Sequence, residues 1–517
     1  MNILTHRQKI NRAYDILFNP LFFVILGFVL LFIVSFKTPV GNDEGMWGYI
    51  GRIWVENQQP PYIGAVENKT PGIMILYAAS YAFFGVNVWF PRLLAAISTV
   101  ISALLIYQLT LKMANCRAAI FAMAIFVLLM ISPYLNGSSA EVETFMNLFI
   151  ISAFYVVFTS SENNRYRCWW MILSGFWWGI AIIFRQTAIL SIVPLALLSV
   201  ATTRIKIRSI AVNAAWLGVG ALLANMISIL PLIFSGATII DYINGAWLIL
   251  LRGNIVVNSI LSRVSGFYRN FFTPDIYLIF LGVVSFVLLR KKIGTIKSFV
   301  GSSIAIWILS DFIVYNIQGQ YFPHHNKVLL LSWSIAFGVV FDFIISRLSI
   351  SKLADNNTGN KVAGTDTVAN PRGDEYVQKI LSICGIILLL LFLVPFQRDY
   401  ILNLRDRTRG LYDNNPQKIG FLIQQMTIPE EYVYVWGMNV GQIYYYSGRQ
   451  APSRYFSNIF LGVPGAVEEV KNSLFMSKSR LIIVSMDESV PLWLNGIIQN
   501  NYYLEQTIYG YYFYKRK

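Results

Sequence analysis

Long apolar runs separated by short polar or basic segments follow one another along most of the chain. Each run is close to the length of about 20 residues that an α-helix needs to cross a bilayer. They lie near residues 20–36, 93–111, 118–134, 145–159, 168–184, 188–203, 209–234, 275–289, 298–317, 326–345 and 380–396. This pattern predicts a mostly α-helical, polytopic membrane protein with about eleven spans.

Two shorter helical patterns lie in the segment that follows the first run. Between Met46 and Val55, the residues Trp47, Ile50 and Trp54 recur at helical spacing. The stretch from Pro71 to Gly85 is apolar but short, and a crossing there would invert every later loop. We therefore predict interfacial helices in this first outer loop, the second of them interfacial or re-entrant.

The pattern changes after the last apolar run. Short stretches of period two predict strands at 432–436, 480–485 and 509–514, and residues 440–446 read as a helix. We predict that residues 397–517 form a small extracytoplasmic α/β domain and that residues 1–396 form the transmembrane catalytic domain. No glycine-rich nucleotide fingerprint follows the first strand, so no cofactor is assigned to the small domain. The polar, turn-rich segment 346–379 is predicted to be a flexible cytoplasmic loop.

Composition and charge support a membrane protein and give its orientation. Only 13% of the 517 residues are charged, against about 25% in soluble chains. Arg7, Lys9 and Arg12 precede the first run, and most other basic residues of the membrane region fall on loops of the same side. By the positive-inside rule these loops and the amino terminus are cytoplasmic, in what we predict to be a bacterial cytoplasmic (inner) membrane.

The net charge of +15 is scattered through these loops, so it indicates topology and not nucleic-acid binding. Cys116, Cys168 and Cys384 all lie at inferred cytoplasmic ends of runs, and the exported part has no cysteine. The sequence therefore predicts no disulfide framework.

Asp43 and Glu44 are adjacent carboxylates at the point where the first apolar run has left the membrane. Ionised groups beside hydrocarbon are costly, so such a pair is a candidate functional site. Asp43 either caps the helix that follows or acts as a general base on a hydroxyl or amine acceptor. Glu44 is expected to orient the acceptor, bind a metal ion, or be solvated.

Further charged residues are predicted on the same outer side. Glu141 and Glu143 precede a later run and are either helix caps or the second wall of an outward-facing cavity. Lys69 pairs with Asp43 or Glu67, or binds a lipid phosphate, and Arg185 presents the same choice. The alternative for both cations is that they extend to the membrane interface.

The run from Gly319 to Lys327 contains His324 and His325, two of the three histidines of the chain. We expect one of them to line the site, in contact with phosphate or with a metal ion. A divalent metal remains open, with Asp43, Glu67 and His324 as the candidate ligands.

Several motifs together resemble the glycosyltransferase C superfamily, specifically bacterial relatives of the protein O-mannosyltransferases and of the lipid A aminoarabinose transferase. The matching motifs are Asp43-Glu44, Lys69-Thr70-Pro71-Gly72, Pro91-Arg92-Leu93-Leu94, Glu143, Tyr321-Phe322-Pro323-His324-His325 and Tyr434-Val435-Trp436-Gly437. The sequence departs from the pattern at two positions. Asn68 stands where the aminoarabinose transferase has a metal-binding glutamate, and Thr70 replaces a proline.

The resemblance implies transfer of a sugar, with inversion, from a polyprenyl-phosphate donor to a lipid, cell-wall glycan or protein acceptor on the outer face. Asp43 would be the catalytic carboxylate, with Glu44 beside it. Lys69, Arg185, His324 and His325 would contact the donor phosphate. Tyr49, Glu67, Glu141, Glu143 and Tyr321 would line the acceptor cavity.

Such a reaction needs no nucleotide site, because the lipid phosphate is the leaving group, and this agrees with the missing phosphate-binding glycine loop. Two other functions are compatible with the sequence. One is a transporter or flippase for a lipid-linked glycan, although the chain has no evident internal repeat and its charges lie at the outer boundary. The other is a glycan polymerase or ligase of the same fold.

Overall fold

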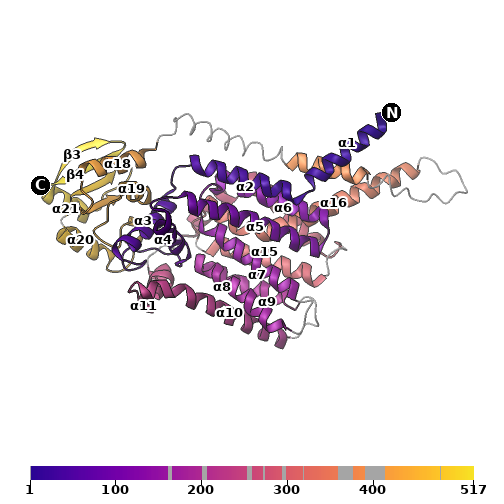
Figure 1. The fold of residues 1–517 in the computed structure, drawn as a ribbon, viewed down its shortest axis with the longest axis horizontal. Coiled ribbons are helices and arrows are strands. Elements are labelled where there is room, and N and C mark those ends of the chain that lie inside the picture. Colours follow the sequence, from indigo (N-terminus) through magenta and orange to yellow (C-terminus); the bar gives the residue numbers. More distant parts are fainter. Residues whose placement is uncertain are drawn as a thin grey trace, which may run out of the picture.

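The chain forms a long helical bundle with a small α/β domain at one end. The computed structural model describes residues 2–160, 166–200, 207–252, 259–271, 274–293, 298–317, 319–358, 376–389, 414–477 and 479–517. The amino terminus lies at the far end of the bundle from the α/β domain, which contains the carboxyl terminus (Figure 1).

Within these residues, six helices are long and apolar enough to cross a membrane, or seven if the bent pair 8–17 and 20–33 is one span. The six are α5 (Trp89–Met113), α7 (Val142–Ser160), α8 (Arg167–Phe184), α10 (Ile207–Phe234), α15 (Ser298–Ile317) and η5 with α16 (Pro323–Leu329 and Leu330–Thr358). The chain is therefore a multi-pass membrane protein, as the sequence predicted.

Most remaining apolar runs form shorter helices. They include α6 (Cys116–Met130), α14 (Pro274–Leu289) and the helix Tyr376–Leu389. The run predicted at 188–203 divides into the 3₁₀-helix η3 (Gln186–Ser191) and the short helix α9 (Ile192–Leu198). Pro194 lies in the first turn of α9, where its missing N–H is tolerated.

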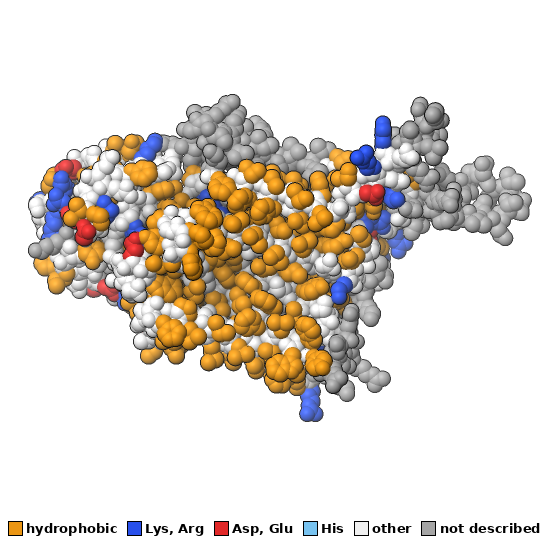
Figure 2. All heavy atoms as spheres, viewed as in Figure 1, with side chains coloured by type: hydrophobic (Ala, Val, Ile, Leu, Met, Phe, Trp, Pro, Cys, Tyr) orange, Lys and Arg blue, Asp and Glu red, His pale blue; other side chains and the backbone are white. Residues whose placement is uncertain are grey.

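The surface of the bundle matches its position in a membrane. Hydrophobic side chains cover the middle of the face shown in Figure 2, and charged side chains gather at the two ends. At the end near the amino terminus these charges are mostly Lys and Arg, whereas the α/β domain carries both signs. Apolar side chains can face lipid at low cost, and charged ones cannot.

Small residues allow the helices α8 and α10 to pack closely. A Cβ atom on Gly175 of α8 would lie 2.0 Å from the carbonyl oxygen of Leu217, and one on Gly220 of α10 would lie 2.0 Å from that of Ile172. Only glycine fits at these two crossing points. Helices in a membrane commonly pack through small residues that let their backbones approach closely. Lipid tails are as apolar as the side chains, so burial of apolar side chains between helices contributes little free energy.

The helix α1 (Asn2–Leu17) leads into α2 (Pro20–Lys37), and two further helices follow before α5. They are α3 (Asn42–Asn57) and α4 (Gly72–Phe84), close to the two helices predicted for this segment. Both lie between the bundle and the α/β domain (Figure 1). A Cβ atom on Gly441 would lie 2.2 Å from the Asn42 carbonyl oxygen, so α3 packs directly against the small domain.

The α/β domain is built on a four-stranded sheet in the order β1-β2-β4-β3. The strands are β1 (Val433–Trp436), β2 (Leu481–Ser485), β3 (Tyr502–Ile508) and β4 (Tyr511–Arg516), and only the β1–β2 pair is parallel. The helices are α18 (Asn415–Met426), α19 (Val440–Ser447), α20 (Ala466–Ser477) and α21 (Leu492–Asn501). Three strands and α19 were predicted, whereas β3 was missed.

The prediction of a flexible loop over 346–379 is wrong in part. Residues 346–358 continue the helix α16, and residues 376–379 begin the helix Tyr376–Leu389. Residues 359–375 lie outside the described part, as does the predicted domain boundary at 396/397. The helix α16 continues because residues 346–354 contain no proline or glycine, so nothing there breaks it.

Candidate active site

A buried ion pair fixes the amino-terminal end of α3. Glu44 is fully buried, and its Oε1 and Oε2 accept hydrogen bonds from Arg92 Nε at 2.9 Å and Arg92 Nη2 at 2.5 Å. The backbone N–H groups of Gly41 and Ala140 donate to the same carboxylate at 3.1 and 2.9 Å. Burial opposes ionisation of Glu44, but the charge and hydrogen bonds of Arg92 hold its pKa below the usual value.

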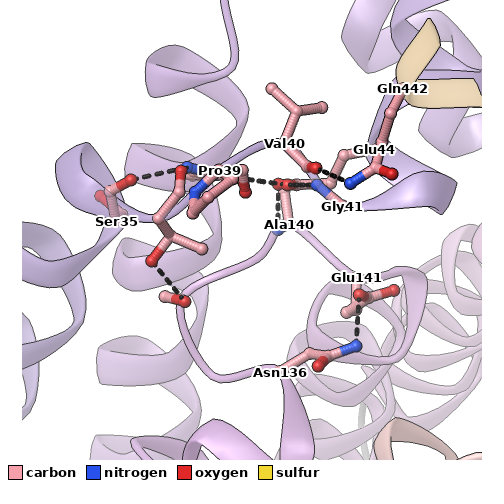
Figure 3. Close-up of polar contacts among 12 residues, drawn as sticks. Ser35, Pro39, Val40, Gly41, Glu44, Asn136, Ala140, Glu141 and Gln442 are labelled. Atoms are coloured by element: carbon pink, nitrogen blue, oxygen red, sulfur yellow. Dashed lines mark hydrogen bonds and ion pairs between the residues drawn. The ribbon is translucent and has the colours of Figure 1, made fainter. Parts of the chain in front are cut away.

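The same arginine ties α2 to α3. Arg92 donates to the carbonyl oxygen of Ser35, in the last turn of α2, at 2.6 Å, and to those of Thr38 and Pro39, just after α2, at 2.7 and 2.9 Å. Figure 3 shows Glu44 against Gly41 and Ala140, with Gln442 of the α/β domain donating to the carbonyl oxygen of Val40. This frame joins four parts of the chain around the start of α3: the end of α2, Arg92, the loop at Ala140 and Gln442.

Asp43 precedes Glu44 but faces a different direction, because consecutive helix residues project about 100° apart. Its side chain is 29% exposed, and Oδ2 lies 4.0 Å from Nε2 of His324. The helix begins at Asn42, so Asp43 is not the N-cap residue, and Glu44 is the carboxylate that binds the Gly41 N–H. Asp43 is therefore the accessible member of the pair.

Lys69 lies in the loop between α3 and α4. Its Nζ is 3.4 Å from Oε1 of Glu67 and 5.5 Å from the centre of the Trp47 ring. Burial lowers the pKa of Lys69, but the charges of Glu67 and Asp43 outweigh this effect and raise it, so the ammonium stays charged. Of the two partners predicted for Lys69, the structure gives Glu67.

The Lys69 loop is held from both sides. The hydroxyl of Tyr62 donates to the Lys69 carbonyl oxygen at 2.7 Å, and the amide of Gln186 donates to that of Asn68 at 2.7 Å. Thr70, which stands where a proline was expected from the resemblance, donates to the carbonyl oxygen of Ile182 at 2.8 Å. The threonine that replaces the proline therefore anchors the loop to the end of α8.

Arg185 follows the last residue of α8 and forms a buried ion pair with Glu143. Burial lowers the pKa of Arg185 to about 10, so its guanidinium remains charged at neutral pH. The carboxylate of Glu143 also belongs to a group with His324 and His325 whose potential ligand atoms lie within 4.8 Å of one another. Arg185, Glu143 and the two histidines, distant in sequence, are thus brought together.

Glu141 is buried near Asp43 on the loop between α6 and α7. Its Oε1 accepts a hydrogen bond from Asn136 at 3.2 Å, as Figure 3 shows. Burial raises the pKa of Glu141 to about 7, the charge of Asp43 adds to this effect, and Lys327 opposes it. Lys327 is fully buried, and its Nζ donates to the carbonyl oxygen of Asn136 and the hydroxyl of Thr144, both at 3.2 Å.

Two predicted cavity residues, Tyr49 and Tyr321, have mainly packing contacts. Tyr49 is 1% exposed, stacks on Tyr444 at 4.8 Å, and accepts a hydrogen bond from the Ala451 N–H at 3.0 Å. Tyr321 is 4% exposed, and its hydroxyl donates to Asn316 at 2.9 Å. Tyr49 therefore belongs to the contact between α3 and the α/β domain.

A second group of side chains that includes His324 has the spacing of a divalent metal site. Asp43, Glu141 and His324 offer ligand atoms within 4.8 Å of one another. Glu141 Oε2 is buried, and no described residue forms a hydrogen bond with it. Carboxylate oxygens and imidazole nitrogen are donors that Zn²⁺ and Mn²⁺ accept, so the set fits a cation. Glu67, a third predicted ligand, is in neither such group in the described part of the chain.

The protein-family comparison matches residues 68–233 to the family described as dolichyl-phosphate-mannose-protein mannosyltransferase. No curated protein sequence matches the chain. Two solved structures of ArnT from Cupriavidus metallidurans are similar to this chain, and each covers 96% of it and 97% of the ArnT chain. The structure bound to undecaprenyl phosphate has a TM-score of 0.61 and 16% identity, and the structure in the apo state has a TM-score of 0.60 and 15% identity.

A third similar structure is the oligosaccharyltransferase AglB from Archaeoglobus fulgidus, in complex with an inhibitory peptide and a dolichol-phosphate. It has a TM-score of 0.54 and 12% identity, covering 96% of this chain and 74% of that one. ArnT and AglB are members of the glycosyltransferase C superfamily. The chain has the glycosyltransferase C fold. The motif resemblance is thereby confirmed at the level of the fold.

Within this glycosyltransferase C fold, the site draws on four separate parts of the chain. Asp43 comes from the start of α3, Lys69 from the loop before α4, Glu141 from the loop before α7, and His324 from η5. Sequence reasoning singled out all four. It gave no role to Arg92 or Lys327, although both lie inside the quoted motif regions, because their partners are far away in sequence.

Proposed function

We propose that the protein is a membrane glycosyltransferase that moves a sugar from a polyprenyl-phosphate donor to an acceptor, with Asp43 as the catalytic carboxylate. The observation that supports this most strongly is the position of Asp43. It is partly exposed, on a rigid buried frame, and faces His324 within a glycosyltransferase C fold. The lipid phosphates in the ArnT and AglB structures agree with such a donor.

In the proposed reaction, the acceptor oxygen or nitrogen attacks the anomeric carbon of the donor sugar as Asp43 accepts its proton. The bond from that carbon to the phosphate oxygen breaks, and the lipid phosphate leaves with the electron pair. Attack opposite to the leaving group inverts the anomeric configuration. The transition state resembles an oxocarbenium ion, so alignment of donor and acceptor and stabilisation of the leaving phosphate are the main requirements.

Positive charge near Asp43 is available for the leaving phosphate. Lys69 and Arg185 are the first candidates, since both stay charged and both feel the electric field of Asp43. His324 and His325 lie next to the same region and offer further hydrogen-bond donors or acceptors. Glu44, fully buried beneath Asp43, is assigned a positioning role in place of the catalytic role predicted from sequence.

Asp43, Glu141 and His324 would hold a divalent cation in this arrangement. Such a cation supplies positive charge to a departing phosphate when it is bound. The proton of the acceptor would still be accepted by the Asp43 carboxylate. A structure of the Archaeoglobus fulgidus oligosaccharyltransferase in complex with Zn and sulfate has the same fold (TM-score 0.52, 11% identity, 96% of this chain and 73% of that chain).

Replacing Lys69 tests the stabilisation of the leaving phosphate. In Lys69→Met combined with Glu67→Gln, both charges of the pair are removed, so no buried carboxylate is left unpaired. We expect turnover to fall about 10²-fold or more while the donor's apparent affinity changes much less, because the lost charge acts mainly in the transition state. Steady-state kinetics over a range of donor concentrations separate the two quantities.

The matched control is Lys112→Met, in the last turn of α5, which is predicted to lie on the opposite side of the membrane. It should leave both kinetic quantities unchanged. Equal loss in the control, or unchanged turnover in the Lys69 variant, would remove Lys69 from the proposed site.

We further propose that the site and the α/β domain face outward, as the basic loops indicate. A cysteine introduced at Gln499, an exposed position of α21, should react in intact cells with a membrane-impermeant maleimide. The native Cys116 is exposed on the predicted cytoplasmic side and should react only after permeabilisation. The opposite labelling pattern would place the site in the cytoplasm and contradict this orientation.

A further inference from the structure

The α/β domain contains a cavity that is separate from the Asp43 site. Its volume is about 430 Å³, and it lies between α20, α21 and the neighbouring strands β3 and β4. Among the residues that line it are Lys471, Phe475, Trp493, Asn501, Tyr502 and Arg516. A cavity of this size is in the range of small-molecule sites, which usually combine apolar walls with a few polar groups.

The aromatic wall of this cavity is held in position. The Trp493 ring packs edge-on against Trp436 at 6.1 Å, and Trp436 is itself fixed by a hydrogen bond from its Nε1 to the Ser489 carbonyl oxygen. The hydroxyl of Tyr502 donates to the carbonyl oxygen of Ser479 at 2.9 Å. Rings that are held in this way suit ligands that present a flat apolar surface, as the C–H face of a sugar ring does.

The two helices that border the cavity carry exposed apolar side chains. Phe475 is 74% exposed and Met476 is 78% exposed at the end of α20, and Leu492 is 91% exposed at the start of α21. Of these three residues, Phe475 lines the cavity itself and adds exposed apolar surface to it, which is typical of a binding site. These residues are not required for the core of the domain, because they contribute little to it.

The polar groups of the cavity favour an anionic ligand. Lys471 and Arg516 contribute two cations, whereas none of the residues that line the cavity is a carboxylate. Lys471 Nζ lies 6.0 Å from the centre of the Trp493 ring, so a charge and a stacking surface are presented together. Glu468, on the same helix, is 68% exposed and pairs with Lys471 at 3.5 Å, a contact that solvent weakens.

The helix α20 is also linked, through Arg454, to the loop that carries Lys69. Glu469, on the side of α20 away from Lys471, forms an ion pair with Arg454 at 3.0 Å. The carbonyl oxygen of Arg454 in turn accepts a hydrogen bond from the N–H of Val66, which precedes Glu67. A ligand on one face of α20 is therefore connected through two contacts to the edge of the Asp43 site.

We propose that this cavity binds an acidic sugar unit of a glycan, a sugar ring that carries a carboxylate or a phosphate. The ring stacks on Trp493, and its anionic group binds Lys471 and Arg516. Neither family motifs nor the transfer reaction require this site. Because α20 links the cavity to the Lys69 loop, the site is suited to hold a distal unit of a glycan that extends from the Asp43 site.

The test measures binding by calorimetry, with the full-length protein in nanodiscs of neutral lipid. The probes are a disaccharide of glucuronic acid and glucose, its neutral counterpart with two glucose units, and inorganic phosphate. We expect the acidic disaccharide to bind with a Kd on the order of 1 mM or tighter. The neutral disaccharide should bind several-fold more weakly, and phosphate alone should show no measurable binding.

Trp493→Ala and Arg516→Gln should each weaken binding of the acidic disaccharide by about tenfold or more. The matched controls Tyr503→Ala and Lys515→Gln alter neighbouring residues that do not line the cavity, and both should bind as the unaltered protein does. Asp43→Asn should also bind normally, which separates this site from the catalytic one.

Any one of the following results would overturn the proposal. They are absence of binding by the acidic disaccharide, equal binding by Trp493→Ala and its control, and loss of binding in Asp43→Asn. Competition by an acidic peptide that is as effective as the disaccharide would also contradict it, since the cavity would then recognise charge without a sugar ring. A normal thermal midpoint of each variant excludes unfolding as the cause.

Discussion

Asp43→Asn is expected to lower sugar transfer by about 10² to 10⁴-fold, the range for loss of a general base. The amide keeps the size of the carboxylate but does not accept the proton of the acceptor. The free energy of unfolding should change little, because the Asp43 side chain is 29% exposed. Within the described residues, its one ion-pair contact is with His324 at 4.0 Å. Removing a negative charge from the first turn of α3 costs about 0.3–1 kcal/mol at most.

The measurement is the initial rate of transfer at saturating donor, together with the thermal midpoint of the purified protein. Asp487→Asn, an exposed aspartate of the α/β domain, is the matched control and should leave the rate unchanged. Transfer at the unaltered rate by Asp43→Asn would show that another group accepts the proton.

Arg92→Leu is expected to destabilise the protein by about 3–5 kcal/mol, the cost of leaving a buried charge without its partner. Glu44 would remain fully buried, and the carbonyl oxygens of Ser35, Thr38 and Pro39 would lose their donor. Because this frame holds the start of α3, Asp43 should be misplaced and transfer should fall as well. The measurement is the thermal midpoint in detergent, read as the loss of monodisperse protein after heating.

Two further variants give this prediction its controls. Arg480→Leu removes an arginine that is 41% exposed and lies 3.7 Å from Glu431, so it should cost about 0–1 kcal/mol. Adding Glu44→Gln to Arg92→Leu removes the unpaired buried charge and should restore part of the stability. An Arg92→Leu protein as stable as Arg480→Leu would mean that the frame does not hold α3.

The sequence predicted the spans and the two helices after the first one, because apolar runs and helical spacing are local signals. It also led to Asp43, since a carboxylate at a membrane boundary is unusual. It did not separate Asp43 from Glu44. That distinction depends on Arg92, 48 positions further along the chain, and on the Ala140 N–H, and neither contact can be read from a local pattern.

Lys327 and β3 show two other limits of the sequence. Lys327 follows the two histidines, but its burial depends on Asn136 and Thr144, which come from a different part of the chain. The strand β3 was missed because most of its side chains are exposed and its pairing with β4 shifts between Leu504 and Gln506. A bulge of this kind disturbs the alternation of apolar and polar residues on which strand prediction depends.

The most direct test supplies the purified protein with one sugar in two activated forms, a polyprenyl-phosphate-linked sugar and the corresponding nucleotide sugar. Transfer to an acceptor extract is measured with each, and Asp43→Asn serves as the blank. We expect transfer from the lipid-linked sugar alone, because the site offers cations for a phosphate at the membrane boundary. Transfer from the nucleotide sugar, with none from the lipid-linked one, would contradict the proposed function.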